Sequence, residues 1–231
     1  MRITILQHTD YEDAGYAAVR LQQRGAEIHT VYMHQPDMQL PAISDVDMLV
    51  ICGGPMGAND SADFPWLNTE KDFIRAAIDA GCAVLGLCLG GQMIASALGA
   101  QVSLNPQPEI GWFPVRAVST SGGTFPFPHN AMIMNWHYET FDLPAAATLL
   151  ASSAACAHQA YQIGERVIGL QCHPEMTAEG IRHLITHFPQ ELQPIPGIQT
   201  AAAIEQGIEQ YAATANQLMA DIVDYLADAA G

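Results

Sequence analysis

Residues 83–95, AVLGLCLGGQMIA, decide how the rest of this sequence is interpreted. Residues 83–87 form a short apolar run, which is typical of a strand that is buried on both faces of a sheet. Glycines lie on both sides of Cys88, and the residues after it have the composition of a helix. Small neighbours allow a sharp strand-to-helix turn that exposes a nucleophile at its tip. The N-terminus of the helix would favour a thiolate, so the stretch predicts a reactive cysteine with a lowered pKa.

A second stretch, residues 167–175 with the sequence VIGLQCHPE, supplies candidate partners for that cysteine. It also has the pattern of a strand that ends in a loop, with His173 and Glu175 two positions apart. In extended chain, such positions point to the same side. A carboxylate placed there can hold an imidazole in one orientation, as the third member of a catalytic triad does. Cys88, His173 and Glu175 are therefore the predicted catalytic residues.

Together, Gly86-Leu87-Cys88-Leu89-Gly90-Gly91-Gln92 and His173-Pro174-Glu175 resemble the class I (triad) glutamine amidotransferases. The resemblance is closest to the stand-alone, GMP-synthase-like group, which includes γ-glutamyl peptidases. It covers roughly residues 1–188. The two motifs in this order are specific, whereas either alone would be weak. It implies an acyl transfer from glutamine or a γ-glutamyl compound through a γ-glutamyl thioester.

The first part of the chain alternates between strand and helix patterns. Strands are expected over 2–7, 27–33, 47–52 and 83–87, and helices over 10–24 and 66–80. This alternation favours an α/β fold, a flavodoxin-like open and mostly parallel sheet with helices on both faces. Ligands of such sheets bind beyond the carboxyl ends of the strands. Gly53, Gly54, Cys88 and His173 would all lie at that edge.

The alternation ends after residue 98. Residues 101–103, 110–119 and 132–136 indicate a small antiparallel region, with turns rich in proline and glycine at 106–108, 121–123 and 126–128. Further prolines interrupt the chain after residue 188, and residues 199–229 have the apolar periodicity of one or two amphipathic helices. We therefore expect one amidotransferase domain over 1–188, with a C-terminal helical extension over 189–231 packed on the same domain.

The loop that begins Gly53-Gly54-Pro55 has two interpretations. It is either an ordinary tight turn after a strand or a source of backbone N–H groups for an oxyanion. A tetrahedral intermediate needs two such donors, and we predict the N–H groups of Leu89 and Gly54. The resemblance supports this choice, because related amidotransferases carry a glycine-rich loop at this place.

The resemblance also implies residues that bind the substrate. Gln92 would orient glutamine from the first turn of its helix, and Gly53, Trp136 and His137 complete the predicted set. For His137, a structural role is the more frequent one for such a histidine. Tyr138-Glu139 stands where the family has Gly-Asp.

Other polar residues have simpler interpretations. Residues 152–161 are expected to line the rim of the glutamine pocket, and Asn59 and Asp60 to lie in a surface loop. We interpret Cys52, Cys82 and Cys172 as inert core thiols, and the histidines at 8, 183 and 187 as structural or surface residues. No cysteine or histidine pair has the spacing of a structural zinc site, so we expect neither metal nor cofactor.

Composition narrows the function further. The chain has 231 residues, 49% of them hydrophobic, and a formal net charge of −16. Such acidity argues against nucleic-acid binding, and no apolar run approaches the ~18 residues of a membrane-spanning helix. Five scattered cysteines and the lack of a signal-peptide pattern indicate a reducing, cytoplasmic setting.

Three functions remain open. The first is a glutaminase that releases ammonia, with a separate ammonia-accepting synthase as its partner. The second is a stand-alone γ-glutamyl peptidase or hydrolase that acts on a γ-glutamyl small molecule. The third is a non-catalytic binding protein of the same fold. A homodimer is compatible with all three.

Overall fold

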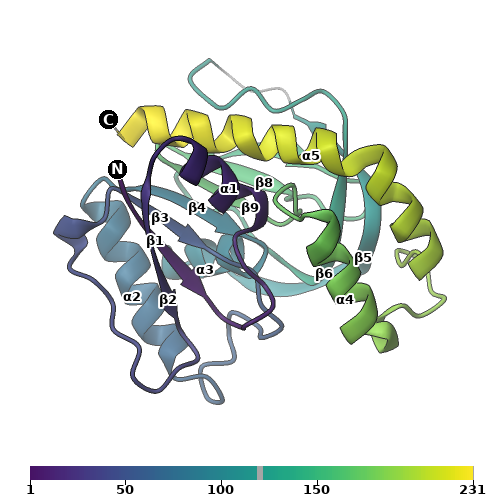
Figure 1. Cartoon of the computed structure of the whole chain (residues 1–231), viewed down its shortest axis with the longest axis horizontal. Coiled ribbons are helices and arrows are strands. Elements are labelled where there is room, and N and C mark those ends of the chain that lie inside the picture. The colour runs from purple at the N-terminus through teal and green to yellow at the C-terminus, as the bar shows by residue number, and fades with distance from the viewer. Residues whose placement is uncertain (119–121, 231) are drawn as a thin grey trace.

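The computed structural model describes residues 1–118 and 122–230 (Figure 1). Within them the strands are β1 (Arg2–Gln7), β2 (Glu27–Tyr32), β3 (Met48–Ile51), β4 (Ala83–Leu87), β5 (Val102–Ala117), β6 (Ala131–Phe141), β7 (Ala147–Ser152), β8 (Ala160–Ile163) and β9 (Val167–Leu170). The helices are α1 (Gly15–Gln23), α2 (Trp66–Asp79), α3 (Leu89–Ala97), α4 (Ala178–His187) and α5 (Ala201–Ala230), with short 3-10 helices at Ile43–Asp45 and Pro189–Glu191.

The described strands form one nine-stranded sheet in the order β2-β1-β3-β4-β9-β8-β7-β5-β6. The first five strands of this order pair in parallel, and β8, β7, β5 and β6 continue the sheet antiparallel. The α/β class, the parallel sheet and the antiparallel region expected from the sequence are therefore confirmed. Because β4 pairs with β3 and β9, the ends of these three strands meet at one edge.

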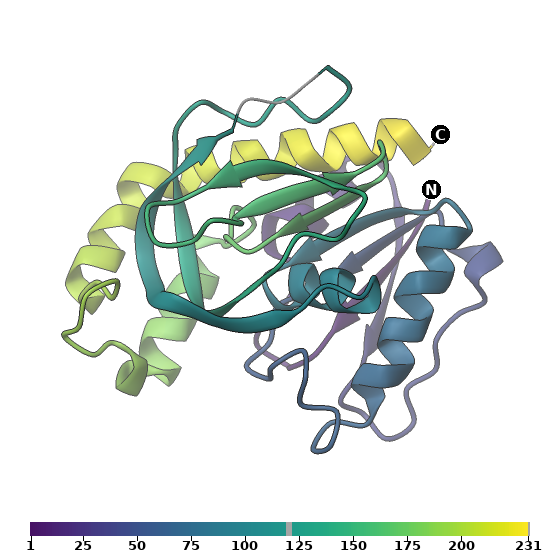
Figure 2. The same ribbon diagram turned by 180° about the vertical axis from the view of Figure 1, so that it is seen from behind.

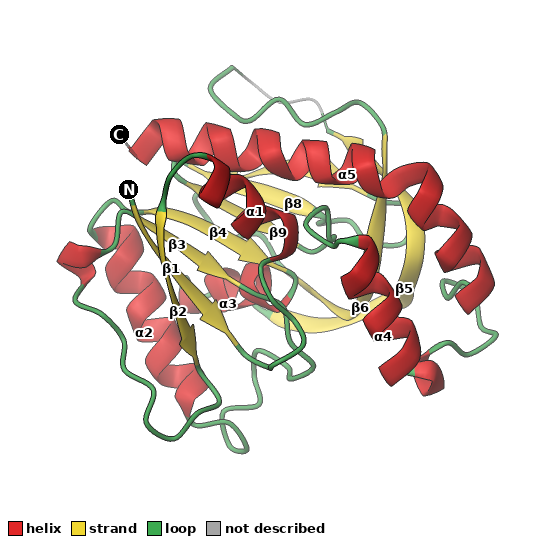
Figure 3. Ribbon diagram, in the orientation of Figure 1, coloured by secondary structure: helices red, strands yellow, loops and turns green. Residues whose placement is uncertain are grey.

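Helices cover both faces of the sheet, as expected. On one face, α1 and α5 pack on alternate side chains of the parallel strands (Figures 1 and 3). On the other face, α2 and α3 pack on the remaining side chains of the same strands, as the reverse view shows (Figure 2). A third apolar cluster lies between β5, β6, α4 and the first half of α5. Helix α5 thus spans two clusters and ties the antiparallel end of the sheet to the parallel end.

Two expected boundaries are wrong. The helix expected from residue 10 begins only at Gly15, so residues 10–14 form a loop at the edge where the strands end. The two strands and the turn expected between 101 and 119 are one strand, β5, with a shift of register against β6 between Leu104 and Glu109. The prolines at 106 and 108 lack N–H donors, and the irregular pairing falls where they lie. Ser119 and Ser121 of the expected strand and turn lie outside the described residues.

A buried charged pair joins β1, α2 and the loop after β3. His8 follows β1, and its ring is held by two contacts: Nδ1 donates to the Gly53 carbonyl at 2.8 Å and Nε2 to Glu70 Oε1 of α2 at 3.0 Å. Both His8 and Glu70 are fully buried. Burial lowers the pKa of His8, but the Glu70 carboxylate and the Gly53 carbonyl outweigh burial, so the pKa is raised. The pair therefore places a protonated imidazole behind the glycine loop.

No helix among the described residues has both the length and the hydrophobicity to cross a membrane.

The His8–Glu70 pair gives a prediction for stability. We expect Glu70→Gln to lower the free energy of unfolding by about 2 kcal/mol, because it leaves the buried His8 without its charged acceptor. Since the pKa of His8 is raised on folding, the stabilisation is full below its unfolded pKa of about 6.5 and is lost as the pH rises through the raised value. Urea denaturation at pH 6 measures the loss of stability in Glu70→Gln, and the same measurement at alkaline pH shows whether the difference from the unmodified protein becomes smaller. The exposed Glu165→Gln is the control, and equal stability of the two variants at pH 6 would contradict the prediction.

Candidate active site

Cys88 occupies a sharp turn between β4 and α3. Its φ of 52° makes it the one non-glycine residue with positive φ in the described part of the chain. The glycines after it let the helix begin directly above the neighbouring strands. A Cβ on Gly90 would clash with the carbonyl of Ile51 in β3, and one on Gly91 would lie 2.5 Å from the carbonyl oxygen of Leu170 in β9. The strand, turn and helix expected from residues 83–95 are thus present, with the thiol at the turn.

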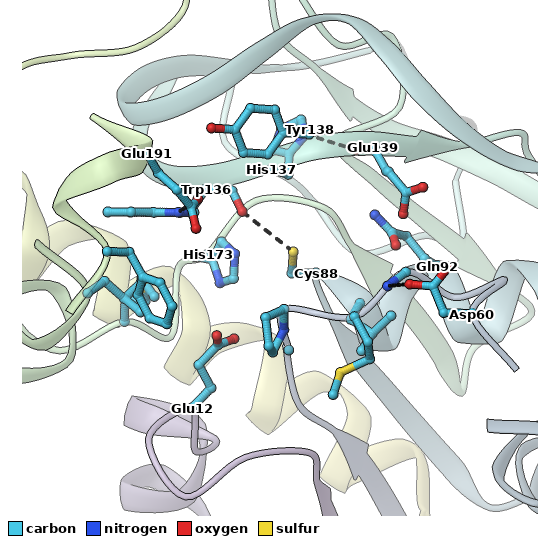
Figure 4. Close-up of a pocket in the computed structure, with 18 residues that line it drawn as sticks. Glu12, Asp60, Cys88, Gln92, Trp136, His137, Tyr138, Glu139, His173 and Glu191 are labelled. Carbon is cyan, nitrogen blue, oxygen red and sulfur yellow. Dashed lines mark hydrogen bonds between the residues drawn. The ribbon is translucent and has the colours of Figure 1, made fainter. Parts of the chain in front are cut away.

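His173 and Glu175 follow β9 and lie next to this turn. The backbone N–H of His173 donates to Met134 of β6 at 2.8 Å, which fixes the segment against the antiparallel part of the sheet. Its Nδ1 donates to Glu175 Oε1 at 2.6 Å, and both side chains are about 95% buried. Its Nε2 has no hydrogen-bond partner among the described residues, and Figure 4 shows the ring beside Cys88. The structure therefore brings the three predicted residues together.

The charge of His173 is set by its surroundings. Burial lowers its pKa, but the Glu175 carboxylate and the adjacent Cys88 outweigh burial and hold the pKa well above its usual range. A protonated ring with a free Nε2 can hold a proton beside the sulfur and deliver it to a departing nitrogen.

Two further groups reach the sulfur. Gln171, which is fully buried, points its Nε2 at Cys88 Sγ at 3.4 Å, and its Oε1 accepts from Gln92 Nε2 at 3.1 Å. The Trp136 carbonyl lies 3.9 Å from the sulfur (Figure 4). Gln171 was not among the predicted site residues. Its position two residues before His173 in extended chain, where both side chains share a side, was the available signal.

The glycine loop after β3 presents a backbone donor. A trans peptide directs its C=O and N–H to opposite sides. Because His8 holds the Gly53 carbonyl, the N–H of Gly54 is turned away from His8, and it has no acceptor in the described part of the chain. Leu89 is the first residue of α3, where N–H groups lack helical partners. Both predicted donors therefore have N–H groups available at the cavity.

A cavity of about 260 Å³ opens at Cys88. Of the predicted residues, Gly54, Cys88, Leu89, Gln92, Trp136, His137 and His173 line it. Gly53 and Glu175 instead line a small adjoining hollow of about 30 Å³. Four carboxylates outside the predicted set of site residues also line the main cavity: Glu12, Asp60, Glu139 and Glu191. Asp60 lies in a surface loop as expected, and that loop forms part of the cavity wall.

His137 lines the cavity and also belongs to a buried polar cluster. Its Nδ1 donates to the Glu139 carbonyl at 3.0 Å, and its Nε2 lies 3.4 Å from Glu109 Oε2. Glu109, His137 and Cys156 offer ligand atoms within 4.8 Å of one another, the one such group of potential metal ligands in the described residues. Glu109 already accepts hydrogen bonds from Ser153 and Gln159. Residues 152–161 therefore lie behind His137 and do not line the cavity, so that expectation is wrong.

The remaining cysteines are buried free thiols. Burial raises the pKa of Cys52 and of Cys172 well above the usual value, which suits inert core residues. Each of the two follows a strand and does not lie within it.

The C-terminal helix supports the His-Pro-Glu segment. Asn216 of α5 donates from Nδ2 to the carbonyls of Pro174 and Met176, at 2.9 and 3.0 Å, on both sides of Glu175. The first turn of α1 completes this support, because the N–H of Tyr16 donates to the Glu175 carbonyl at 2.8 Å. These contacts join segments that are far apart in the chain, so no local sequence pattern predicts them.

Comparisons with known proteins agree with this geometry. A glutamine amidotransferase-like protein of Salmonella typhimurium is 34% identical over 204 residues, which are 85% of this chain and 85% of that protein. A glutamine-hydrolysing GMP synthase of Aeromonas hydrophila is 30% identical over 175 residues, 68% of this chain but only 31% of the synthase. Gamma-glutamyl peptidase 3 of Arabidopsis thaliana is 29% identical over 154 residues, 62% of this chain and 61% of the peptidase.

The fold is shared with a solved structure as well. The crystal structure of a glutamine amido transferase from Methylobacillus flagellatus superimposes with a TM-score of 0.93 and 31% sequence identity, over 99% of this chain and 94% of that one. The family model of the class-I glutamine amidotransferases matches residues 15–188, well over half of the chain. The chain therefore belongs to the class I glutamine amidotransferase family.

Proposed function

We infer that the chain is a cysteine-dependent hydrolase of γ-glutamyl amides, with glutamine as the simplest substrate. The observation that carries this inference is the arrangement of Cys88 at a strained turn beside His173, whose Nδ1 is held by Glu175 at 2.6 Å and whose Nε2 is free. This is the geometry of an activated nucleophile with an oriented base.

In the first half of the reaction, the Cys88 thiolate adds to the γ-carboxamide carbon. The carbonyl oxygen becomes an oxyanion that accepts hydrogen bonds from the N–H groups of Gly54 and Leu89. His173 then delivers its Nε2 proton to the departing nitrogen, and ammonia leaves as the γ-glutamyl thioester forms. Gln92 is the proposed contact for the substrate, and Trp136 and His137 form the cavity wall.

In the second half, water attacks the thioester while His173 accepts its proton. The carbon–sulfur bond breaks, Cys88 returns as the thiolate, and glutamate is released. For the case in which glutamine is the natural substrate, we propose a separate synthase as the acceptor of the ammonia, because the GMP synthase relative extends well beyond the region that it shares with this chain. The free thiols fit a reducing, cytoplasmic setting.

A second candidate is a stand-alone γ-glutamyl peptidase. It is favoured by the similarity to gamma-glutamyl peptidase 3. Both candidates use the same three catalytic residues. They are distinguished by the rates at which the protein hydrolyses glutamine and γ-glutamyl dipeptides.

We expect Cys88→Ser to abolish glutamate release from glutamine and from γ-glutamyl dipeptides, because the hydroxyl is a far weaker nucleophile than the thiolate. Purified protein is assayed with each substrate, and mass spectrometry checks labelling by a glutamine-mimicking electrophile. Cys82→Ser, which changes a buried thiol away from the cavity, is the control. Rapid cleavage of dipeptides indicates the peptidase, and slow hydrolysis of glutamine indicates a missing synthase. Glutamate release by the Cys88→Ser protein, or a thiol at Cys88 that resists the electrophile, would refute the mechanism.

Glu175→Gln tests the role of the carboxylate. Because Glu175 raises the pKa of His173, its loss should lower that pKa and move the alkaline limb of the pH–rate profile to lower pH. The maximal rate should fall by roughly 10²-fold, since the ring loses its orientation as well. The exposed Glu179→Gln, near the same segment, should leave the profile unchanged. An unshifted alkaline limb in Glu175→Gln would contradict the assignment.

We also propose that residues 189–231 form one unit with residues 1–188 and position the catalytic segment through Asn216. Asn216→Ala removes two hydrogen bonds of about 1 kcal/mol each, and we expect kcat to fall roughly tenfold with KM little changed. The neighbouring exposed Gln217→Ala is the control on the same helix. Steady-state kinetics and thermal melting are compared, and an unchanged kcat in a folded Asn216→Ala protein would refute the positioning role.

A further inference from the structure

Apart from two histidines, the charged side chains that line the main cavity are all carboxylates. Glu12, Asp60, Glu139 and Glu191 line it, and none of the described lining residues is a lysine or an arginine. A substrate that enters this cavity meets four carboxylates, and His173 is the basic group that opposes them, so away from His173 the lining disfavours anionic groups and favours cationic ones.

The carboxylates are divided between two sides of Cys88. Figure 4 shows Gln92, Asp60 and Glu139 on one side of the sulfur, and His173, Glu12 and Glu191 on the other. In the proposed reaction, His173 protonates the departing nitrogen, so the leaving group lies on the side of His173. The γ-glutamyl portion then extends toward Gln92, where Asp60 and Glu139 face its α-ammonium group.

Glu12 lies beside Cys88 and His173. A Cβ placed on Gly53 would lie 2.8 Å from Glu12 Oε2, 3.7 Å from His173 Cε1 and 3.8 Å from Cys88 Cβ, so these three groups surround one glycine. The side-chain carboxylate of Glu12 has no hydrogen-bond partner among the described residues. Burial raises its pKa, and the positive charge of His173 offsets part of that rise. The carboxylate faces the cavity and is not sealed from solvent, so it is free to accept a hydrogen bond from a ligand there.

Glu191 faces the same side and is held in place. Its Oε2 accepts from Trp136 Nε1 at 2.7 Å, which leaves the other oxygen available to a ligand. The charge of Glu191 acts on Glu12, so a cation between them would relieve repulsion between the two carboxylates. Apolar side chains line the cavity as well, namely Met176, Leu184 and Phe188 around α4. They offer a surface to a short methylene chain.

We propose that the leaving group of the natural substrate is a cationic amine, and that Glu12 and Glu191 bind its distal ammonium group. The substrate class is thus a γ-glutamyl amide of a diamine, with the chain of methylenes against Met176, Leu184 and Phe188. This inference rests on the proposed hydrolysis at Cys88. The amide C–N bond breaks, the amine nitrogen takes its proton from His173, and water supplies the oxygen of the new γ-carboxylate.

Three synthetic amides test this assignment. Each joins the γ-carboxyl of glutamate to an amine with four methylenes, and the chains end in an ammonium, a methyl or a carboxylate group. We expect kcat/KM for the ammonium compound to exceed that for the methyl compound by roughly tenfold, as one charge-assisted hydrogen bond provides, and the carboxylate compound to be the poorest. Glu12→Gln and Glu191→Gln should each reduce the ammonium-to-methyl ratio, while the exposed Glu165→Gln should keep it.

Binding separates this inference from the proposed reaction. Calorimetric titration of the Cys88→Ser protein with the same three compounds reports the charge preference without turnover. Tighter binding of the ammonium compound than of the methyl compound, if it is lost in Cys88→Ser/Glu12→Gln, supports the cationic site. If the protein with Cys88 intact hydrolyses none of the three compounds, that result overturns the proposed reaction but not the cationic site. Equal binding of the ammonium and methyl compounds, or a preference for the carboxylate compound, would overturn the cationic site whether or not Cys88 proves catalytic.

Discussion

The unfavourable backbone conformation of Cys88 sets the geometry of the whole site. A positive φ at a residue with a side chain is unfavourable, so the surrounding structure has to impose it. Here β4 is paired on both sides, and α3 begins in contact with the carbonyls of Ile51 and Leu170, which only glycines at 90 and 91 permit. The strand order of the sheet therefore places the thiol between the glycine loop after β3 and the histidine after β9.

Two buried histidine–carboxylate pairs flank this turn, and they differ in one respect. In His8 both ring nitrogens have acceptors, Gly53 and Glu70, so the ring is fully satisfied and serves to hold a loop. In His173 only Nδ1 is satisfied, and Nε2 faces the cavity without a partner. The same pair of residue types therefore stabilises structure at one position and leaves a reactive proton at the other. Which role a buried pair has depends on the second nitrogen and not on the carboxylate.

Local patterns in the sequence predicted the parallel strands, the turn at Cys88 and the His-Pro-Glu segment, because each is fixed by neighbouring residues and by the period of the apolar positions. Glu12, Glu191 and Asn216 were missed because they reach the site from loops and a helix that are distant in sequence. The long strand β5 was missed for the opposite reason. Its two prolines indicate a turn locally, whereas pairing with β6 on both sides of the irregular segment keeps the chain extended.

The acidic side of the cavity also bears on what happens to the nitrogen that leaves. A protein that hands ammonia to a partner has to keep it neutral, whereas carboxylates at Glu12 and Glu191 stabilise the protonated form of any amine beside them. A protonated His173 at the same place favours proton delivery in the same direction. Both features suit an amine that departs as a cation into solvent better than ammonia that must travel to a second site. Of the two proposed functions, the charge of the cavity therefore favours the stand-alone hydrolase.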